Sequence, residues 1–318
     1  MLRRAFLLAS ASFGLAPGEA RAAGQPVSVL YAGSLVTAFE RDFFPFAAEH
    51  GVDVQGEAKG SVALANLIES GLRTPDVFVS ADALAIEPLM SAAHGALVAW
   101  YATFATTRLV IGYAPKSPFA ATFAEVAKGA LRLDAALQAP DLHLGRTDPA
   151  LDPKGYRTLI AMELFGRLRG DAGLARKVLG EPRNPKQIVP EEALLARLES
   201  GDLDAAFLYS TESAARRLPS VELPPEANLG DPALAATYAE VSVTVEGKRH
   251  AGAPIVYALT IPKAAPNAGG ANALVRLMFG AEGRRVLEGA GLHLVRPAVR
   301  GDASAVPASL REALGVRR

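Results

Sequence analysis

The amino-acid sequence predicts an α/β protein of two lobes separated by a hinged cleft. The first observation is that residues 27–82 read as strand, helix, strand, helix, strand, an order typical of a parallel sheet with helices on its faces. The second is that strand and helix patterns recur over residues 108–209. The third is a strongly apolar strand at residues 254–262, which we expect to lie again in the first lobe. A chain that crosses twice between two lobes forms a cleft, where small ligands usually bind.

The overall composition excludes several classes of function. The 318 residues include 33 Lys and Arg and 33 Asp and Glu, so the formal net charge is zero. This balance argues against a broad nucleic-acid surface or a polybasic membrane surface. Hydrophobic residues make up 50% of the chain, which is enough for a packed core. The sequence contains no cysteine, so disulfides, thiolate metal ligands and thiol nucleophiles are excluded.

The first 22 residues have the pattern of a cleaved export signal. Arg3 and Arg4 precede an apolar run at residues 5–15, and residues 20–22 form an A-x-A cleavage site. The arginine pair fits a twin-arginine signal as well as an ordinary secretory signal. We therefore expect an exported mature protein whose location is the periplasm.

In the expected first lobe, two serine turns follow strands and open helices. Gly33 and Ser34 follow the strand at residues 27–31, and Ser61 follows the strand at residues 52–57. Serine is a common N-cap, and the first N–H groups of a helix have no intrahelical partner. Two such helix starts that point to one place form an anion site from backbone donors. The alternative is that both serines only cap helices.

In the expected second lobe, two further helix starts and one strand end carry candidate site residues. Asp152 suits an N-cap position and Pro153 the first helical position. Glu191 lies in the first turn of a later helix, and Tyr209 ends an apolar strand at residues 203–209, which places it on the cleft side if this sheet is parallel. Each residue also has a purely structural interpretation, as a cap, a partner of the helix dipole or an aromatic residue at the edge of the core.

The two expected crossings define the limits of the lobes. We predict a first lobe of residues 23–103 and 246–318 and a second lobe of residues 104–245. Near the second crossing, residues 219–232 are rich in Pro and acidic residues and predict a surface loop, and residues 238–245 alternate like a strand.

Seven short motifs, together with the export signal, resemble a known family. The motifs are residues 31–35 (YAGSL), 60–63 (GSVA), 76–82 (DVFVSAD), 145–149 (GRTDP), 151–157 (LDPKGYR), 198–201 (LESG) and 254–257 (PIVY). With them the chain resembles the tungstate/molybdate-binding proteins of ABC importers, in the branch best known from archaea. The resemblance covers nearly all of residues 26–300. It implies a type II periplasmic-binding-protein fold that holds an oxyanion in the cleft.

The resemblance also implies a set of ligand-binding residues from both lobes. The matched positions are Gly33, Ser34 and Ser61 in the first lobe and Asp152, Pro153, Lys154, Glu191 and Tyr209 in the second. In this family two carboxylates coordinate the metal atom of the bound anion, and Asp152 and Glu191 match them. Leu208, before Tyr209, departs from the pattern, because this position is commonly acidic in the branch.

A pair of carboxylates in the cleft helps to identify the ligand. A desolvated site for a simple dianion should avoid Asp and Glu, because like charges repel strongly there. As the resemblance implies, Asp152 and Glu191 raise tungsten or molybdenum from four to six oxygen ligands, which sulfur and phosphorus do not allow. Such a site accepts tungstate or molybdate and rejects sulfate and phosphate. The two favoured anions are nearly equal in size and charge, so the sequence does not rank them. The resemblance further implies delivery to permease and ATPase subunits by a monomer without a cofactor.

Three other functions remain open from the residues alone. The chain could bind another oxyanion, or ferric iron, since Tyr209 with Asp152 and Glu191 imitates a ferric site. It could be an enzyme in which the carboxylate pair acts as general acid and base. Against an enzyme, the 5 histidines are scattered, and no G-x-S-x-G, P-loop or H-E-x-x-H motif occurs. It could also be a signalling or adhesion module that uses the same fold.

Overall fold

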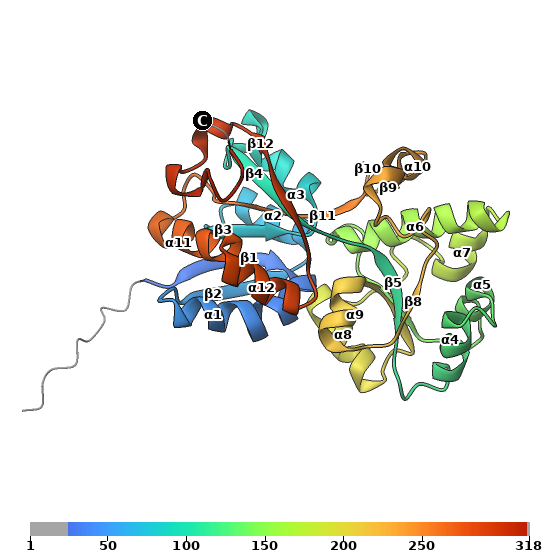
Figure 1. Ribbon diagram of the computed structural model, residues 1–318. Coiled ribbons are helices and arrows are strands. Elements are labelled where there is room, and N and C mark those ends of the chain that lie inside the picture. The colour runs from blue at the N-terminus through green and yellow to red at the C-terminus, as the bar shows by residue number, and fades with distance from the viewer. Residues whose placement is uncertain (1–24, 317–318) are drawn as a thin grey trace, which may run out of the picture.

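Two lobes lie side by side in the computed structural model, which describes residues 25–316 (Figure 1). The first lobe is built on a six-stranded sheet and the second on a four-stranded sheet. The predicted two-lobed α/β class is therefore confirmed. The predicted export signal at residues 1–22 lies outside the described residues. Across the described part of the chain, no helix combines the length and the apolar character needed to cross a membrane.

The sheet of the first lobe is mixed, with the strand order β12-β4-β11-β3-β1-β2. Its strands are β1 (Val27–Ala32), β2 (Val54–Lys59), β3 (Val77–Ser80), β4 (Trp100–Thr107), β11 (Ile255–Thr260) and β12 (His293–Gly301). β1 is parallel to β2 and β3, whereas β11 is antiparallel to both β3 and β4. β4 therefore runs in the direction of β1 to β3, and β11 brings the chain back. The carboxyl ends of β1 to β4 meet at one edge, which faces the second lobe (Figure 1).

Helices cover both faces of this sheet. They are η1 (Gly33–Leu35), η2 (Thr37–Phe43), α1 (Phe44–Glu49), α2 (Ser61–Glu69), α3 (Ala83–Met90), η3 (Ala92–His94), α11 (Ala268–Phe279) and α12 (Ala281–Gly289), with η5 (Ala303–Ala305) and η6 (Ala308–Leu310) near the end. The expected single helix after Ser34 is instead a 3-10 turn, a π-helical segment and a short α-helix. The buried rings of Phe39, Phe43 and Phe44 pack near Tyr31 of β1, and this aromatic cluster holds the irregular segment in place.

The sheet of the second lobe has the order β6-β7-β5-β8. Its strands are β5 (Leu109–Tyr113), β6 (Leu144–Gly145), β7 (Ala205–Tyr209) and β8 (Ser220–Glu222), and its helices are α4 (Ala120–Ala127), α5 (Leu133–Leu137), α6 (Pro153–Arg169), α7 (Leu174–Leu179), α8 (Glu191–Ser200) and α9 (Ser210–Arg216). Helix α6 is buried along most of its length and lies next to the first lobe (Figure 1). The prediction of a loop over residues 219–232 was wrong at β8, which pairs with β5 to form the sheet edge.

The chain passes between the lobes at two places. β4 ends at Thr107 and β5 begins at Leu109, so Arg108 alone separates strands of different sheets. On the way back, the chain forms η4 (Pro232–Leu234), α10 (Ala235–Ala239) and the hairpin of β9 (Ser242–Val245) and β10 (Lys248–Ala251) before β11. Residues 238–245 are thus strand-like only from Ser242, because α10 occupies their start. The limits of the lobes given above stay a prediction.

Candidate functional site

The first turn, at Gly33 and Ser34, supplies backbone donors to a carboxylate of the other lobe. The Gly33 N–H donates to Glu191 Oε2 at 2.8 Å and the Ser34 N–H donates to Glu191 Oε1 at 3.0 Å. These residues begin η1 at the carboxyl end of β1. The expectation that Ser34 caps a helix was wrong, because Ala32 holds the N-cap position and no side chain caps this turn. The free amides of the turn are nevertheless used as anion donors, as predicted for a helix start.

The second turn, at Gly60 and Ser61, brings the lobes into close contact. Ser61 is the first residue of α2 and does not cap it; its buried hydroxyl accepts the Ala81 N–H at 3.0 Å and so joins α2 to the end of β3. A Cβ atom on Gly60 would lie 2.5 Å from the Leu151 carbonyl oxygen, so only glycine allows this approach. The Ala63 N–H donates to the same Leu151 carbonyl at 3.1 Å.

Asp152 begins α6 and is held by two hydrogen bonds. Its Oδ1 accepts the Lys154 N–H at 2.7 Å and the Thr147 hydroxyl at 2.8 Å. Pro153 occupies the first turn of α6, where a missing N–H has no cost, so the predicted capping role of Asp152 and placement of Pro153 are confirmed. The Asp152 side chain is buried beside the first lobe, near Gly60.

The segments that carry Asp152 and Glu191 are joined to each other by Arg146. Its backbone forms a parallel β-bridge with Ile188. The Val189 N–H donates to the Arg146 carbonyl, and the Arg146 N–H donates to the Gln187 carbonyl, each at 2.9 Å. Its buried guanidinium donates to the carbonyls of Glu181 and Pro182. Burial lowers the pKa of Arg146 to about 10. The spacing of the two carboxylates is thus determined within the second lobe.

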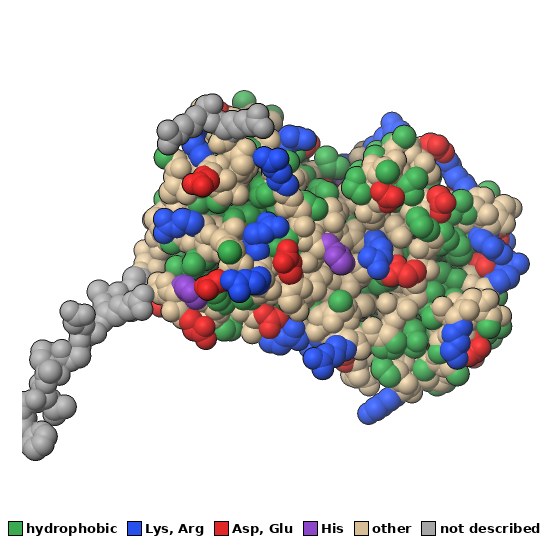
Figure 2. Space-filling model, viewed as in Figure 1, with side chains coloured by type: hydrophobic (Ala, Val, Ile, Leu, Met, Phe, Trp, Pro, Cys, Tyr) green, Lys and Arg blue, Asp and Glu red, His purple; other side chains and the backbone are tan. Residues whose placement is uncertain are grey.

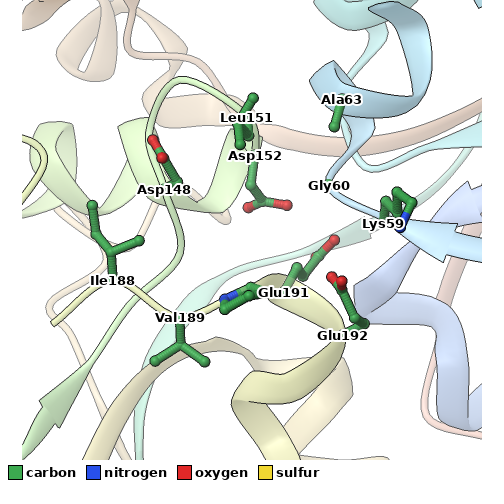
Figure 3. A pocket seen from close by; sticks show the side chains of 11 residues that line it. Lys59, Gly60, Ala63, Asp148, Leu151, Asp152, Ile188, Val189, Glu191 and Glu192 are labelled. Atoms are coloured by element: carbon green, nitrogen blue, oxygen red, sulfur yellow. The ribbon is translucent and has the colours of Figure 1, made fainter. Parts of the chain in front are cut away.

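Asp152 and Glu191 direct their carboxylates into the same space between the lobes (Figure 3). Only 3% of Asp152 and 5% of Glu191 are exposed, so little water screens their repulsion. Burial, and then the charge of Asp152, raise the pKa of Glu191 well above its ordinary value, although Lys154 opposes them. Glu191 therefore ionises at a higher pH than a separate glutamate side chain does.

Lys154 provides a fully buried ammonium group beside these carboxylates. Its Nζ lies 2.8 Å from Glu212 Oε1, 2.9 Å from Glu212 Oε2 and 3.5 Å from Glu191 Oε1. It also lies 5.3 Å from the centre of the Tyr209 ring. Burial by itself would lower the pKa of Lys154, but the carboxylates of Glu212, Glu191 and Asp152 raise it above its ordinary value. The lysine is therefore charged.

Tyr209 meets the other residues through Arg157. The Arg157 guanidinium donates from Nη1 to the Tyr209 hydroxyl at 2.8 Å and to the Ala81 carbonyl at 2.7 Å, and Nη2 lies 3.2 Å from Asp82 Oδ1. Asp82 also accepts a hydrogen bond from the Tyr156 hydroxyl. Since Arg157 and Tyr209 belong to the second lobe and residues 81–82 to the first, this network connects the lobes. Burial raises the pKa of Tyr209 well above its ordinary value, so the phenol is neutral.

A cavity of about 310 Å³ opens between the lobes next to the carboxylates. Its lining includes Lys59 and Gly60 from the first lobe and Asp152 and Glu191 from the second (Figure 3). On the face of the molecule in Figure 2, basic and acidic side chains are interspersed, as the balanced composition predicts. At the cleft, in contrast, several charged side chains are buried together, among them Asp152, Lys154 and Glu191.

The structure thus brings together most of the residues named from the sequence. Glu191 contacts Gly33, Ser34 and Lys154 directly, and the Lys154 N–H contacts Asp152. Tyr209 joins them through Lys154 and Arg157. Ser61 contacts the site only through Ala81, and Pro153 shapes its turn without a polar contact. Sequence reasoning missed Asp82, Arg157, Glu212 and Tyr257, whose hydroxyl donates to Ser34 Oγ at 3.4 Å. For Glu212 a local signal existed, since an acidic residue is favoured in the first turn of a helix.

Comparison with known proteins identifies the family of this chain. Residues 27–293 match the family model described as bacterial extracellular solute-binding protein. The chain belongs to this family. Membership places this solute-binding protein outside the cytoplasm and points to transport rather than catalysis.

Individual members and a solved structure agree with this assignment. The solute-binding protein is 37% identical over 241 residues to a protein of Haloferax volcanii named as an ABC transporter molybdenum-binding protein, covering 74% of this chain and 72% of that one. It is 31% identical over 285 residues to a molybdate/tungstate-binding protein of Pyrococcus abyssi, covering 81% of each chain. The periplasmic molybdate-binding protein of Azotobacter vinelandii aligns with a TM-score of 0.58 and 19% identity, over 85% of this chain and 99% of that one, which shows a common fold. The predicted resemblance is confirmed.

Proposed function

We propose that this solute-binding protein captures tungstate or molybdate between its lobes and delivers it to the permease and ATPase subunits of an ABC importer. The names of the relatives from Haloferax volcanii and Pyrococcus abyssi support this choice of ligand. The observation that carries the proposal is the buried pair of Asp152 and Glu191 carboxylates beside the backbone donors of Gly33 and Ser34.

The Glu191 carboxylate now occupies the donors that an oxyanion would use. In the ligand-bound protein, oxygens of the anion take over the Gly33 and Ser34 N–H groups, since a turn of this kind favours any negative group placed there. The Glu191 and Asp152 carboxylates then coordinate the central metal atom. The Ser61 and Tyr209 hydroxyls supply further contacts to oxygen, and so does the Lys154 N–H once Asp152 turns from it to the metal atom.

The same arrangement explains the expected selectivity. Sulfate and phosphate present only oxygens to Asp152 and Glu191, and repulsion between like charges is strong in a site from which water is excluded. Tungstate and molybdate offset this repulsion because their metal atoms accept the carboxylate oxygens as ligands. Rejection of the wrong anions and acceptance of the right ones therefore depend on the same two side chains.

Calorimetric titration of the purified mature protein tests the proposal. We expect tight binding of tungstate and molybdate and no measurable binding of sulfate or phosphate at the same concentrations. Tight binding of sulfate or phosphate would contradict the proposal. Ferric citrate is added as a further probe, because coloured ferric binding would favour an iron-binding function.

We also propose the periplasm as the location, reached through the signal at residues 1–22, and delivery of the anion by a monomer. Mass spectrometry of the exported protein measures both the new N-terminus and the oligomeric state. A mature chain that begins at residue 23 is the expected result.

A further inference from the structure

Glu212 joins three parts of the second lobe that carry proposed ligand-binding residues. Its carboxylate accepts hydrogen bonds from the Lys154 ammonium at 2.8 and 2.9 Å and from the Tyr209 N–H at 2.7 Å. Through Lys154 it also reaches Glu191, whose Oε1 lies 3.5 Å from the same ammonium. Glu212 is 2% exposed and lies in the first turn of α9. Neither the sequence motifs nor the comparisons assign it a function.

The two buried cations near Glu191 and Tyr209 are already bound to acceptor groups of the protein itself. The ammonium of Lys154 is fully buried and directed at the Glu212 and Glu191 carboxylates. The guanidinium of Arg157 is directed at Asp82, Tyr209 and the Ala81 carbonyl. An anion at the Gly33 and Ser34 amides therefore meets backbone amides and hydroxyls, while both buried cations, Lys154 and Arg157, are held by groups of the protein. Lys59 lines the adjoining cavity and is partly exposed.

We propose that Glu212 is a positioning residue for selectivity: it holds the Lys154 ammonium as the counter-cation of Glu191 and keeps it from the bound anion. This inference rests on the proposed function. A simple dianion such as sulfate gains greatly from a nearby ammonium, because hydrogen bonds between charged partners are the strong ones. Tungstate instead depends on coordination by carboxylates. Because Glu212 holds the Lys154 ammonium and prevents it from donating to the anion, sulfate binding is weakened more than tungstate binding.

The first test is Glu212→Gln in the full mature protein, with tungstate and sulfate titrated separately. Without the carboxylate, Lys154 can turn to an anion in the cleft, so sulfate affinity rises and the tungstate-to-sulfate affinity ratio falls by about tenfold to a hundredfold. The matched control is Glu226→Gln, which removes one charge from an exposed side chain outside this cavity and changes both affinities by a similar factor. A purely structural role would lower both affinities together and leave the ratio unchanged, which would overturn the inference.

The double variant Lys154→Met/Glu212→Gln gives a second, independent result. It leaves no unpaired charge from this pair in the interior, so it remains informative if the single variant does not fold. With no ammonium present, sulfate affinity stays at the wild-type level, whereas tungstate affinity falls at least about tenfold because Glu191 has lost its counter-cation. A double variant that binds tungstate like the wild type overturns the inference. A wild-type protein that does not bind tungstate overturns the inference and the proposed function together, whereas a selective wild type with an equally selective Glu212→Gln overturns the inference alone.

Discussion

The carboxylate of Glu191, in the second lobe, accepts a hydrogen bond of 3.0 Å from the backbone N–H of Ser34, in the first. An internal carboxylate thus occupies the N–H donors that we propose for an oxyanion. The proposed ligand would have to compete with Glu191 for these donors.

Replacement of Glu191 by glutamine tests the role of this carboxylate. We expect Glu191→Gln to lower tungstate affinity by about tenfold to a hundredfold, because a neutral amide is a poor ligand for the metal atom. Sulfate affinity should rise, since the glutamine amide can donate a hydrogen bond to a sulfate oxygen, whereas an ionised carboxylate would repel it. Titration of both anions, with a thermal melt to verify folding, measures the change, and an unchanged ratio would place Glu191 outside the coordination shell.

The raised pKa of Glu191 predicts that anion binding depends on pH. In the folded protein this pKa lies above its value in the unfolded chain, about 4.3. The stability that this group contributes is therefore complete below that value and is lost as the pH rises through the folded pKa. Because the metal atom binds the ionised carboxylate, tungstate binding should release a proton, and affinity should increase with pH. Calorimetry in two buffers with different ionisation enthalpies measures the proton count, and a count of zero would contradict the prediction.

Substitution of Gly60 should impair the approach of the two lobes without a large effect on the stability of the fold. Gly60 has φ −56°, which alanine adopts without strain, but the added Cβ would lie 2.5 Å from the Leu151 carbonyl of the other lobe. We expect Gly60→Ala to change the free energy of unfolding by less than about 1 kcal/mol. Tungstate affinity should fall by at least about tenfold, because even small displacements of binding groups are costly. The control is Gly269→Ala, in α11, where a Cβ meets open space and affinity stays unchanged.

Removal of the Arg157 guanidinium should destabilise the protein. Arg157→Met leaves the buried Asp82 carboxylate without its cation, and the loss of one partner from a buried pair costs about 3 to 5 kcal/mol. Denaturant titration measures the free energy of unfolding. The matched control on the same helix is Arg167→Met, whose partner Glu240 is exposed, so its effect should stay within about 0.5 kcal/mol. Equal effects of the two variants would show that the interior network is not important for stability.

The parts of the site that could be predicted from the sequence have local signals. Asp152 and Pro153 form a recognisable helix start, and Glu191 lies in the first turn of α8, where an acidic residue is favoured. The partners of these residues were not predictable, because they come from distant segments: Arg157 contacts the carbonyl of Ala81, which lies 76 positions earlier. No local pattern encodes such a contact between lobes.

The serine turns also show that a local preference does not predict a hydrogen bond to a distant segment. The preference of serine for N-caps predicted that Ser61 bonds to its own helix, but the hydroxyl instead accepts the N–H of Ala81, 20 positions later. The fold of the first lobe decided this outcome, because the parallel arrangement of β1 to β3 brings the start of α2 next to the end of β3. Propensity located the turns correctly but not the hydrogen bonds that they form.

Both carboxylates belong to one lobe and are linked through Arg146, whereas the Gly33 and Ser34 amides belong to the other. Under the proposed function, the first lobe therefore binds the oxygens of the anion and the second lobe coordinates its central atom. Since Glu191 already joins the two lobes, contact between the lobes alone would not tell a transporter that the anion is present. The transporter would have to respond to a change at the surface of the protein that only the bound anion causes.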